Sequence, residues 1–210
     1  MQVRFLDKTY NYGNDAASVD ELFAEINNML ADTEYVLAGM VIDNTEVYES
    51  YQEYIIERIS NIKAIEVFVD TVENMINNIL GSMSEYLDRA IPELEPLTSD
   101  FYTGEEENSS IEKLGQLAEG IHWMLNMIST IDQNKDLHNG LKTNGAWYEC
   151  VSNAARLNEE FENLKDAIRN TDMILIADII KYEVSDVFSG INQCIKLING
   201  HGEGENANLQ

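Results

Sequence analysis

From Val72 to Ile198, apolar residues recur every three or four positions, and this period constrains the fold more than any other feature. Such spacing is typical of helices that bury one face against their neighbours. Four stretches carry it: 72–101, 111–128, 147–168 and 176–198. With short connections between them, these stretches predict an antiparallel four-helix bundle over residues 72–200.

Continuous heptads would also allow a coiled-coil oligomer. Glycines at 81, 115, 120 and 190 make long unbroken coiled coils less favourable, so we favour the intramolecular bundle. Pro92 and Pro96 interrupt the first stretch and predict a kink or a restarted helix. Gly200 is placed to end the last helix, which leaves 201–210 as a disordered tail.

The first 71 residues change period several times. Strand patterns occupy 3–6, 35–42, 45–48 and 65–69, while 11–15 is a turn cluster. Ser18 and Glu21 have capping-box spacing ahead of one helix, and a second helix covers 51–59. The order predicts a ferredoxin-like (βαββαβ) unit, in which two helices cover an antiparallel sheet, although a simpler α+β variant stays open. The predicted class is therefore α+β, with a small α/β domain over 1–71 followed by the helical bundle.

The chain is strongly acidic, with 38 Asp and Glu against 13 Lys and Arg and a net charge of −25. Such a surface repels phosphate backbones and anionic lipids, so we expect no nucleic-acid or membrane partner. It favours a basic protein partner, a cation, or solubility alone. We expect a cytoplasmic location, because no segment has the length of a membrane span and no secretory pattern opens the chain. Cys150 and Cys194 are expected to be free thiols in a reducing compartment.

Glu119 and His122 form a Glu-x-x-His element, which di-iron bundle proteins use in pairs. No second copy exists, because neither His138 nor His201 has a glutamate three residues earlier. Glu183 falls on the apolar stripe of the last helix, so it is a weak candidate for a general acid or base with a raised pKa. We favour the alternative, in which Glu183 lies at the edge of the stripe and reaches water.

Asp132, Asn134 and Asp136 match the opening of a calcium-binding loop. Such loops need glycine at the sixth position and glutamate at the twelfth, where this chain has Leu137 and Thr143. We therefore expect a solvated connection between helices, with no metal and no cofactor.

Tyr48, Tyr51 and Tyr54 cluster at the start of the second predicted helix. They fit two roles equally well, as anchors of a protein interface or as caps over the core of the small domain.

The leading functional hypothesis is a non-enzymatic, acidic interaction or adaptor protein of a bacterial-type cytosol. It would bind a helical or basic protein partner in a groove between helices. One concrete version is a chaperone-like holder of a helical client. The α/β domain would supply a second contact or form a homodimer through its sheet.

The alternative is a carboxylate-based, metal-dependent or hydrolytic enzyme whose site in the bundle uses Glu119, Glu183 and His122. A third hypothesis, an acidic mimic of nucleic acid, requires a row of carboxylates at phosphate-like spacing.

Overall fold

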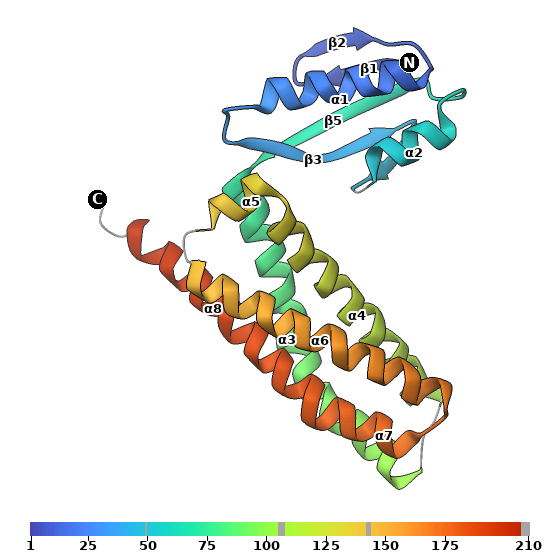
Figure 1. Cartoon of the computed structure of the whole chain (residues 1–210), viewed down its shortest axis with the longest axis vertical. Coiled ribbons are helices and arrows are strands. Elements are labelled where there is room, and N and C mark those ends of the chain that lie inside the picture. Colours follow the sequence, from blue (N-terminus) through green and yellow to red (C-terminus); the bar gives the residue numbers. More distant parts are fainter. Residues whose placement is uncertain (49, 105–107, 142–143, 207–210) are drawn as a thin grey trace. The chain divides into compact units, whose positions relative to one another are not determined.

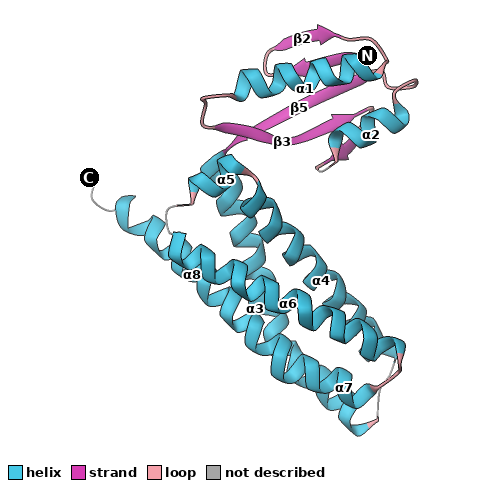
Figure 2. Ribbon diagram, in the orientation of Figure 1, coloured by secondary structure: helices cyan, strands magenta, loops and turns pink. Residues whose placement is uncertain are grey.

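The computed structural model describes residues 1–48, 50–104, 108–141 and 144–206 and shows a mixed α+β chain (Figures 1 and 2). Two compact units make up the chain, Met1–Met75 and Ile76–Gln210, called here the α/β unit and the helical unit. The first part of the chain contains β1 (Gln2–Phe5), β2 (Lys8–Asn11), α1 (Ala16–Leu30), β3 (Tyr35–Ile42), β4 (Thr45–Val47), α2 (Tyr51–Arg58) and β5 (Ala64–Thr71). The remainder contains α3 (Val72–Thr103), α4 (Asn108–Gln133), α5 (Lys135–Gly140), α6 (Asn144–Arg169), α7 (Met173–Asp178), the π-helix η1 (Ile179–Val184) and α8 (Ser185–Asn206).

The sheet has the strand order β2-β1-β5-β3-β4. β1 and β5 are parallel, and the other neighbouring pairs are antiparallel. The purely antiparallel, four-stranded sheet of the ferredoxin-like prediction is therefore wrong. The reason is a turn at Leu6, whose φ is 52°, after which Lys8–Asn11 folds back along β1 as an unpredicted strand. This reversal sends the chain into α1 from the opposite end of the sheet.

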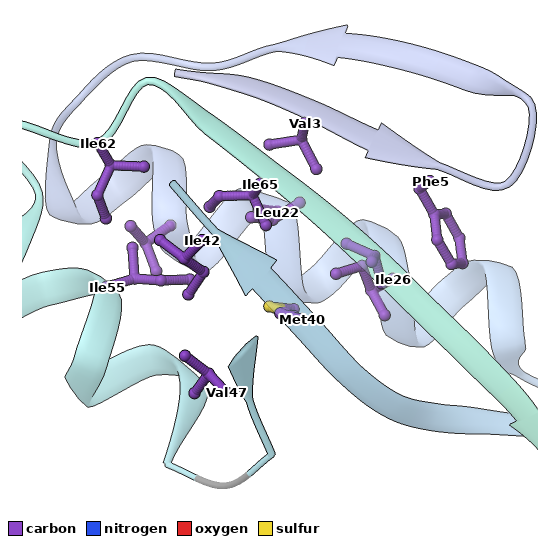
Figure 3. Close-up of a cluster of buried hydrophobic side chains, with 12 residues drawn as sticks. Val3, Phe5, Leu22, Ile26, Met40, Ile42, Val47, Ile55, Ile62 and Ile65 are labelled. Atoms are coloured by element: carbon purple, nitrogen blue, oxygen red, sulfur yellow. The ribbon is translucent and has the colours of Figure 1, made fainter. Parts of the chain in front are cut away.

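The core of the α/β unit lies between one face of the sheet and helices α1 and α2 (Figure 3). Val3 and Ile65 alternate with more exposed residues along their strands and are paired across β1 and β5, so their side chains lie on the same buried face. Leu22 and Ile26 of α1 and Ile55 of α2 pack against this face. Helix α1 begins earlier than predicted because the side chain of Asp15, rather than that of Ser18, caps it.

The helical unit contains four long helical segments, α3, α4, α6 and the continuous run α7–η1–α8, and successive segments alternate in direction (Figure 2). Helix α3 neither ends nor restarts at Pro92 and Pro96. Both prolines lie on the exposed side of the helix, so water can bond the carbonyls of Asp88 and Pro92, which lose their usual donors.

Two further features of the helical unit differ from the prediction. The connection 132–145 contains helix α5, whose first amides are bonded by the side chain of Asn134. Helix α8 continues past Gly200 to Asn206, so the predicted tail is helical as far as that residue, and 207–210 lie outside the described residues. None of the helices in the described part of the chain combines the length and apolar character needed to cross a bilayer.

Candidate functional site

The three residues proposed for acid–base or metal chemistry are all exposed. Glu119 and His122 lie on the outer face of α4. There, Nε2 of His122 lies 3.3 Å from the side-chain nitrogen Nδ2 of Asn126. Glu183 is exposed on η1. Across the described ranges, no group of three or more His, Cys, Asp or Glu side chains is arranged to hold a metal ion.

Glu183 is exposed because the helix changes its hydrogen-bonding pattern at η1. The amide of Ser185 donates to the carbonyl oxygen of Ile180, five residues back, which makes this a π-turn. Ile179, Ile180 and Val184 of η1 are buried, as is Val187 of α8. Val184 therefore occupies the inner position to which the sequence period assigned Glu183.

The π-turn lies beside a cluster of polar and aromatic side chains, called here the π-turn surface: Tyr102, Asp178, Lys181 and Tyr182. Tyr102 Oη of α3 donates to Asp178 Oδ1 at 2.5 Å. Lys181 Nζ lies 5.4 Å from the centroid of the Tyr102 ring and 5.5 Å from that of Tyr182. The hydrogen bond to Asp178 is the main cause that raises the pKa of Tyr102 to about 12.

Large exposed side chains occur in the same helical run, two of them on α7 and one in the π-turn surface itself. Ile174 and Leu175 of α7 are 53% and 45% exposed, and Tyr182 of η1 is 59% exposed. Asp172 caps α7 by accepting from the amide of Leu175, which places a carboxylate next to these apolar groups. Ile174, Leu175 and Tyr182, called here the apolar strip, share this helical run with the carboxylates of Asp172 and Asp178.

A second feature is a cleft of about 320 Å³ between α3 and α4. Its floor consists of the buried side chains Leu94, Leu97 and Leu117, with half-buried Ala90 beside them. The backbones of α3 and α4 make few close approaches, so side chains rather than main-chain packing bridge the two helices.

Polar groups also line this cleft. Lys113 Nζ of α4 pairs with Glu93 Oε2 of α3 at 3.1 Å. The Nε atom of Arg89 donates to the carbonyl oxygen of Glu85 at 3.2 Å. Burial raises the pKa of Tyr86, whose ring lies half-buried in the cleft wall, to about 12. Gly120 leaves room for its hydroxyl, because a Cβ atom there would lie 1.9 Å from Tyr86 Oη.

The three clustered tyrosines differ in how far they are buried. Tyr51 and Tyr54 are half-buried and pack against the core of the α/β unit. Tyr48 is 68% exposed, and its hydroxyl donates to Glu46 at 2.7 Å. Its ring lies against Gly39, where an added Cβ would be 3.2 Å away. Of the three, Tyr48 therefore offers the most surface to a partner.

Two residues of the calcium-like segment already have structural partners. Asp132 Oδ1 accepts from the indole nitrogen of Trp147 at 3.1 Å and lies 3.4 Å from Nδ1 of His138. Asn134 Oδ1 accepts from the first amides of α5. Position 143, the expected glutamate position, lies outside the described residues.

Cys150 and Cys194 are buried, free thiols on the packed helices α6 and α8. Burial is the main cause that raises the pKa of both thiols, and the two groups also interact with each other. Asn153 Nδ2 lies 4.0 Å from Cys194 Sγ. Protonated, enclosed thiols of this kind are poor nucleophiles.

Sequence reasoning missed the cleft and the aromatic half of the π-turn surface. Tyr86, Ala90, Leu94 and Leu97 follow a visible helical stripe, but a stripe does not identify the helix that it faces. Gly120 was interpreted only as a weak point for coiled coils.

Comparison with known proteins places the chain in a family. No curated protein and no solved structure gives a significant match. One family model matches residues 78–194, which include most of α3, all of α4 and the π-turn. Because the match spans more than half of the 210 residues, the chain belongs to the family described as a domain of unknown function (DUF8042).

Proposed function

We propose that this chain is a non-enzymatic, acidic interaction protein that binds a basic amphipathic segment of a protein partner through the π-turn surface and the neighbouring apolar strip. An adaptor or a chaperone-like holder of a helical client would both use such a surface. We also propose a cytoplasmic location and a closed antiparallel four-helix bundle for the helical unit. The observation that carries the proposal is the exposed strip formed by Ile174, Leu175 and Tyr182.

Apolar exposure supports a docking role for this strip. When a partner covers exposed leucine and isoleucine side chains, the free energy of binding becomes more favourable by about 25 cal/mol per Å² of buried apolar area. Tyr182 and Tyr102 add rigid aromatic area with polar tips, which is the composition of interface hot spots.

Charge supports a basic partner. Asp172 and Asp178 lie along α7 and Glu183 follows on η1, with Lys181 as the cation among them. The whole chain carries −25, so its long-range field attracts cationic segments and repels nucleic acids. A helix with an apolar face and lysine or arginine along its borders matches both properties of the surface.

A pair of designed peptides tests the proposal. Both are amphipathic helices with the same leucine face, and the polar face is lysine in one and glutamate in the other. Fluorescence anisotropy should show that the lysine peptide binds and the glutamate peptide does not. A triple serine variant at Ile174, Leu175 and Tyr182 should bind the lysine peptide at least tenfold more weakly, or about 1.4 kcal/mol.

Matched controls separate this surface from the general charge of the chain. Ile111 on α4 and Tyr148 on α6 are 49% and 78% exposed, so their double serine variant removes comparable apolar surface elsewhere. This control should bind as the wild type does. Equal losses in both variants, or equal binding of the two peptides, would contradict the proposal.

A further inference from the structure

We propose that the cleft between α3 and α4 is a binding site for a small amphipathic carboxylate, meaning an apolar body that carries one carboxylate group. This site is separate from the π-turn surface, and the inference does not depend on the proposed protein partner.

The shape of the cleft follows from two facing stripes. Tyr86, Ala90, Leu94 and Leu97 repeat at helical spacing on α3, and Leu117 faces them from α4. The floor is apolar because it consists of the side chains of Leu94, Leu97 and Leu117, each of which is 4% exposed or less. A volume of about 320 Å³ lies at the small end of the range of ligand pockets, roughly 300–1,000 Å³, so the body of the ligand is short.

Arg89 provides the charge at the mouth of the cleft. Each of the other four arginines, Arg4, Arg58, Arg156 and Arg169, forms an ion pair with a carboxylate. Arg89 forms none within the described residues, although the chain contains 38 acidic residues. Among the residues that the structure describes, the guanidinium bonds through its Nε alone, to the carbonyl oxygen of Glu85. Within that part of the chain both terminal nitrogens are open to a bidentate contact with a carboxylate.

Lys113 and Glu93 pair across the two helices at the same mouth. With Arg89 they give the lining a net charge of +1 in a chain whose net charge is −25. This local reversal of sign selects an anion over a cation.

Tyr86 adds a hydroxyl at the cleft wall. Its ring makes edge-to-face contacts with Trp123 and Phe188, with centroids 5.9 and 6.2 Å away. Its Oη has no hydrogen-bond partner in the part of the chain that the structure describes, and it remains accessible to water. Gly120 provides the space that this hydroxyl needs. A phenol of raised pKa stays protonated at neutral pH and can donate to a ligand oxygen.

Calorimetric titration of the full chain with octanoate, octylamine and octanol tests the inference. Octanoate should bind with the highest affinity, octanol more weakly and octylamine not at all. Butanoate should bind more weakly than octanoate, because it leaves most of the apolar floor uncovered. Equal binding of octanoate and octylamine, or no binding of octanoate, would overturn the proposal.

Two variants and a control locate the bound octanoate. Arg89→Gln should weaken octanoate binding about tenfold, while Arg169→Gln removes the same charge elsewhere and should leave affinity unchanged. Ala90→Leu fills the cleft and should abolish binding while the helical unit keeps a cooperative melt. If Arg89→Gln and Ala90→Leu both bind octanoate as the wild type does, the ligand lies elsewhere and the inference is wrong.

Discussion

Substitution of Gly120 by alanine tests whether Tyr86 is held against the backbone of α4. A Cβ atom at 120 would lie 1.9 Å from Oη and 2.2 Å from Cζ of Tyr86, far inside van der Waals contact. The ring cannot yield freely, because Trp123 and Phe188 both contact it edge to face. Gly115, on the same helix, has nothing within 4 Å of an added Cβ and is the matched control.

The expected effects have opposite signs. Replacing glycine by alanine in an exposed helix stabilises by about 1 kcal/mol, so Gly115→Ala should raise the free energy of unfolding by that amount. At Gly120 the same gain is opposed by displacement of Tyr86, which loses two aromatic contacts worth about 0.5–1.5 kcal/mol each and strains the site. The net change should be a loss of about 1–2 kcal/mol. In a Tyr86→Ala background, Gly120→Ala should become stabilising.

Urea unfolding followed by tryptophan fluorescence measures these changes. Both tryptophans, Trp123 and Trp147, lie in the helical unit, so the signal reports that unit alone. If Gly120→Ala stabilises the chain as much as Gly115→Ala does, the ring of Tyr86 is not packed against the backbone of α4 at Gly120.

Two further predictions concern residues that contact α8, Asp88 on α3 and Cys150 on α6. The pKa of the Asp88 carboxyl is lowered, mainly by the hydrogen bond from Asn192 and then by the one from Lys196. The ionised carboxylate therefore stabilises the folded chain above the pKa of the unfolded state, which is about 4. This stabilisation is lost as the pH falls through the lower pKa of the folded state. Asp88→Asn should therefore lower the free energy of unfolding at neutral pH and change it little near pH 2, as urea titrations at the two pH values would show. Cys150 and Cys194, whose pKa values are raised by burial, should react with Ellman's reagent slowly in the native protein at neutral pH and quickly in urea; fast native reaction would mean that the thiols are open to solvent.

Much of the local structure could be predicted from residue patterns. The strand Tyr35–Ile42 has the predicted bounds, and α2 begins at the predicted Tyr51. In the strand the continuous apolar run agrees with β-branched content, and in α2 the residues Tyr51, Tyr54 and Ile55 recur at helical spacing. The strand Lys8–Asn11 escaped prediction because it is a polar edge strand that pairs only with β1.

Properties set by distant parts of the chain were not predictable. Whether β1 pairs with β5 in parallel depends on a contact between segments far apart in sequence, for which a single sequence holds no direct signal. The burial of Val184 in place of Glu183 depends on a π-turn that helical periodicity does not anticipate. Arg89 looks in sequence like any exposed cation, since its lack of an acidic partner among the described residues is visible only in three dimensions.

The pairing of β1 with β5 also orders events during synthesis. The ribosome releases the hairpin β1–β2 first, yet one edge of β1 has no partner until Ala64–Thr71 has emerged. Over that interval the unpaired edge is open to pairing with other nascent chains. The helices of the helical unit expose no unpaired strand edge during synthesis, because each helix forms its backbone hydrogen bonds between its own residues as it leaves the ribosomal tunnel.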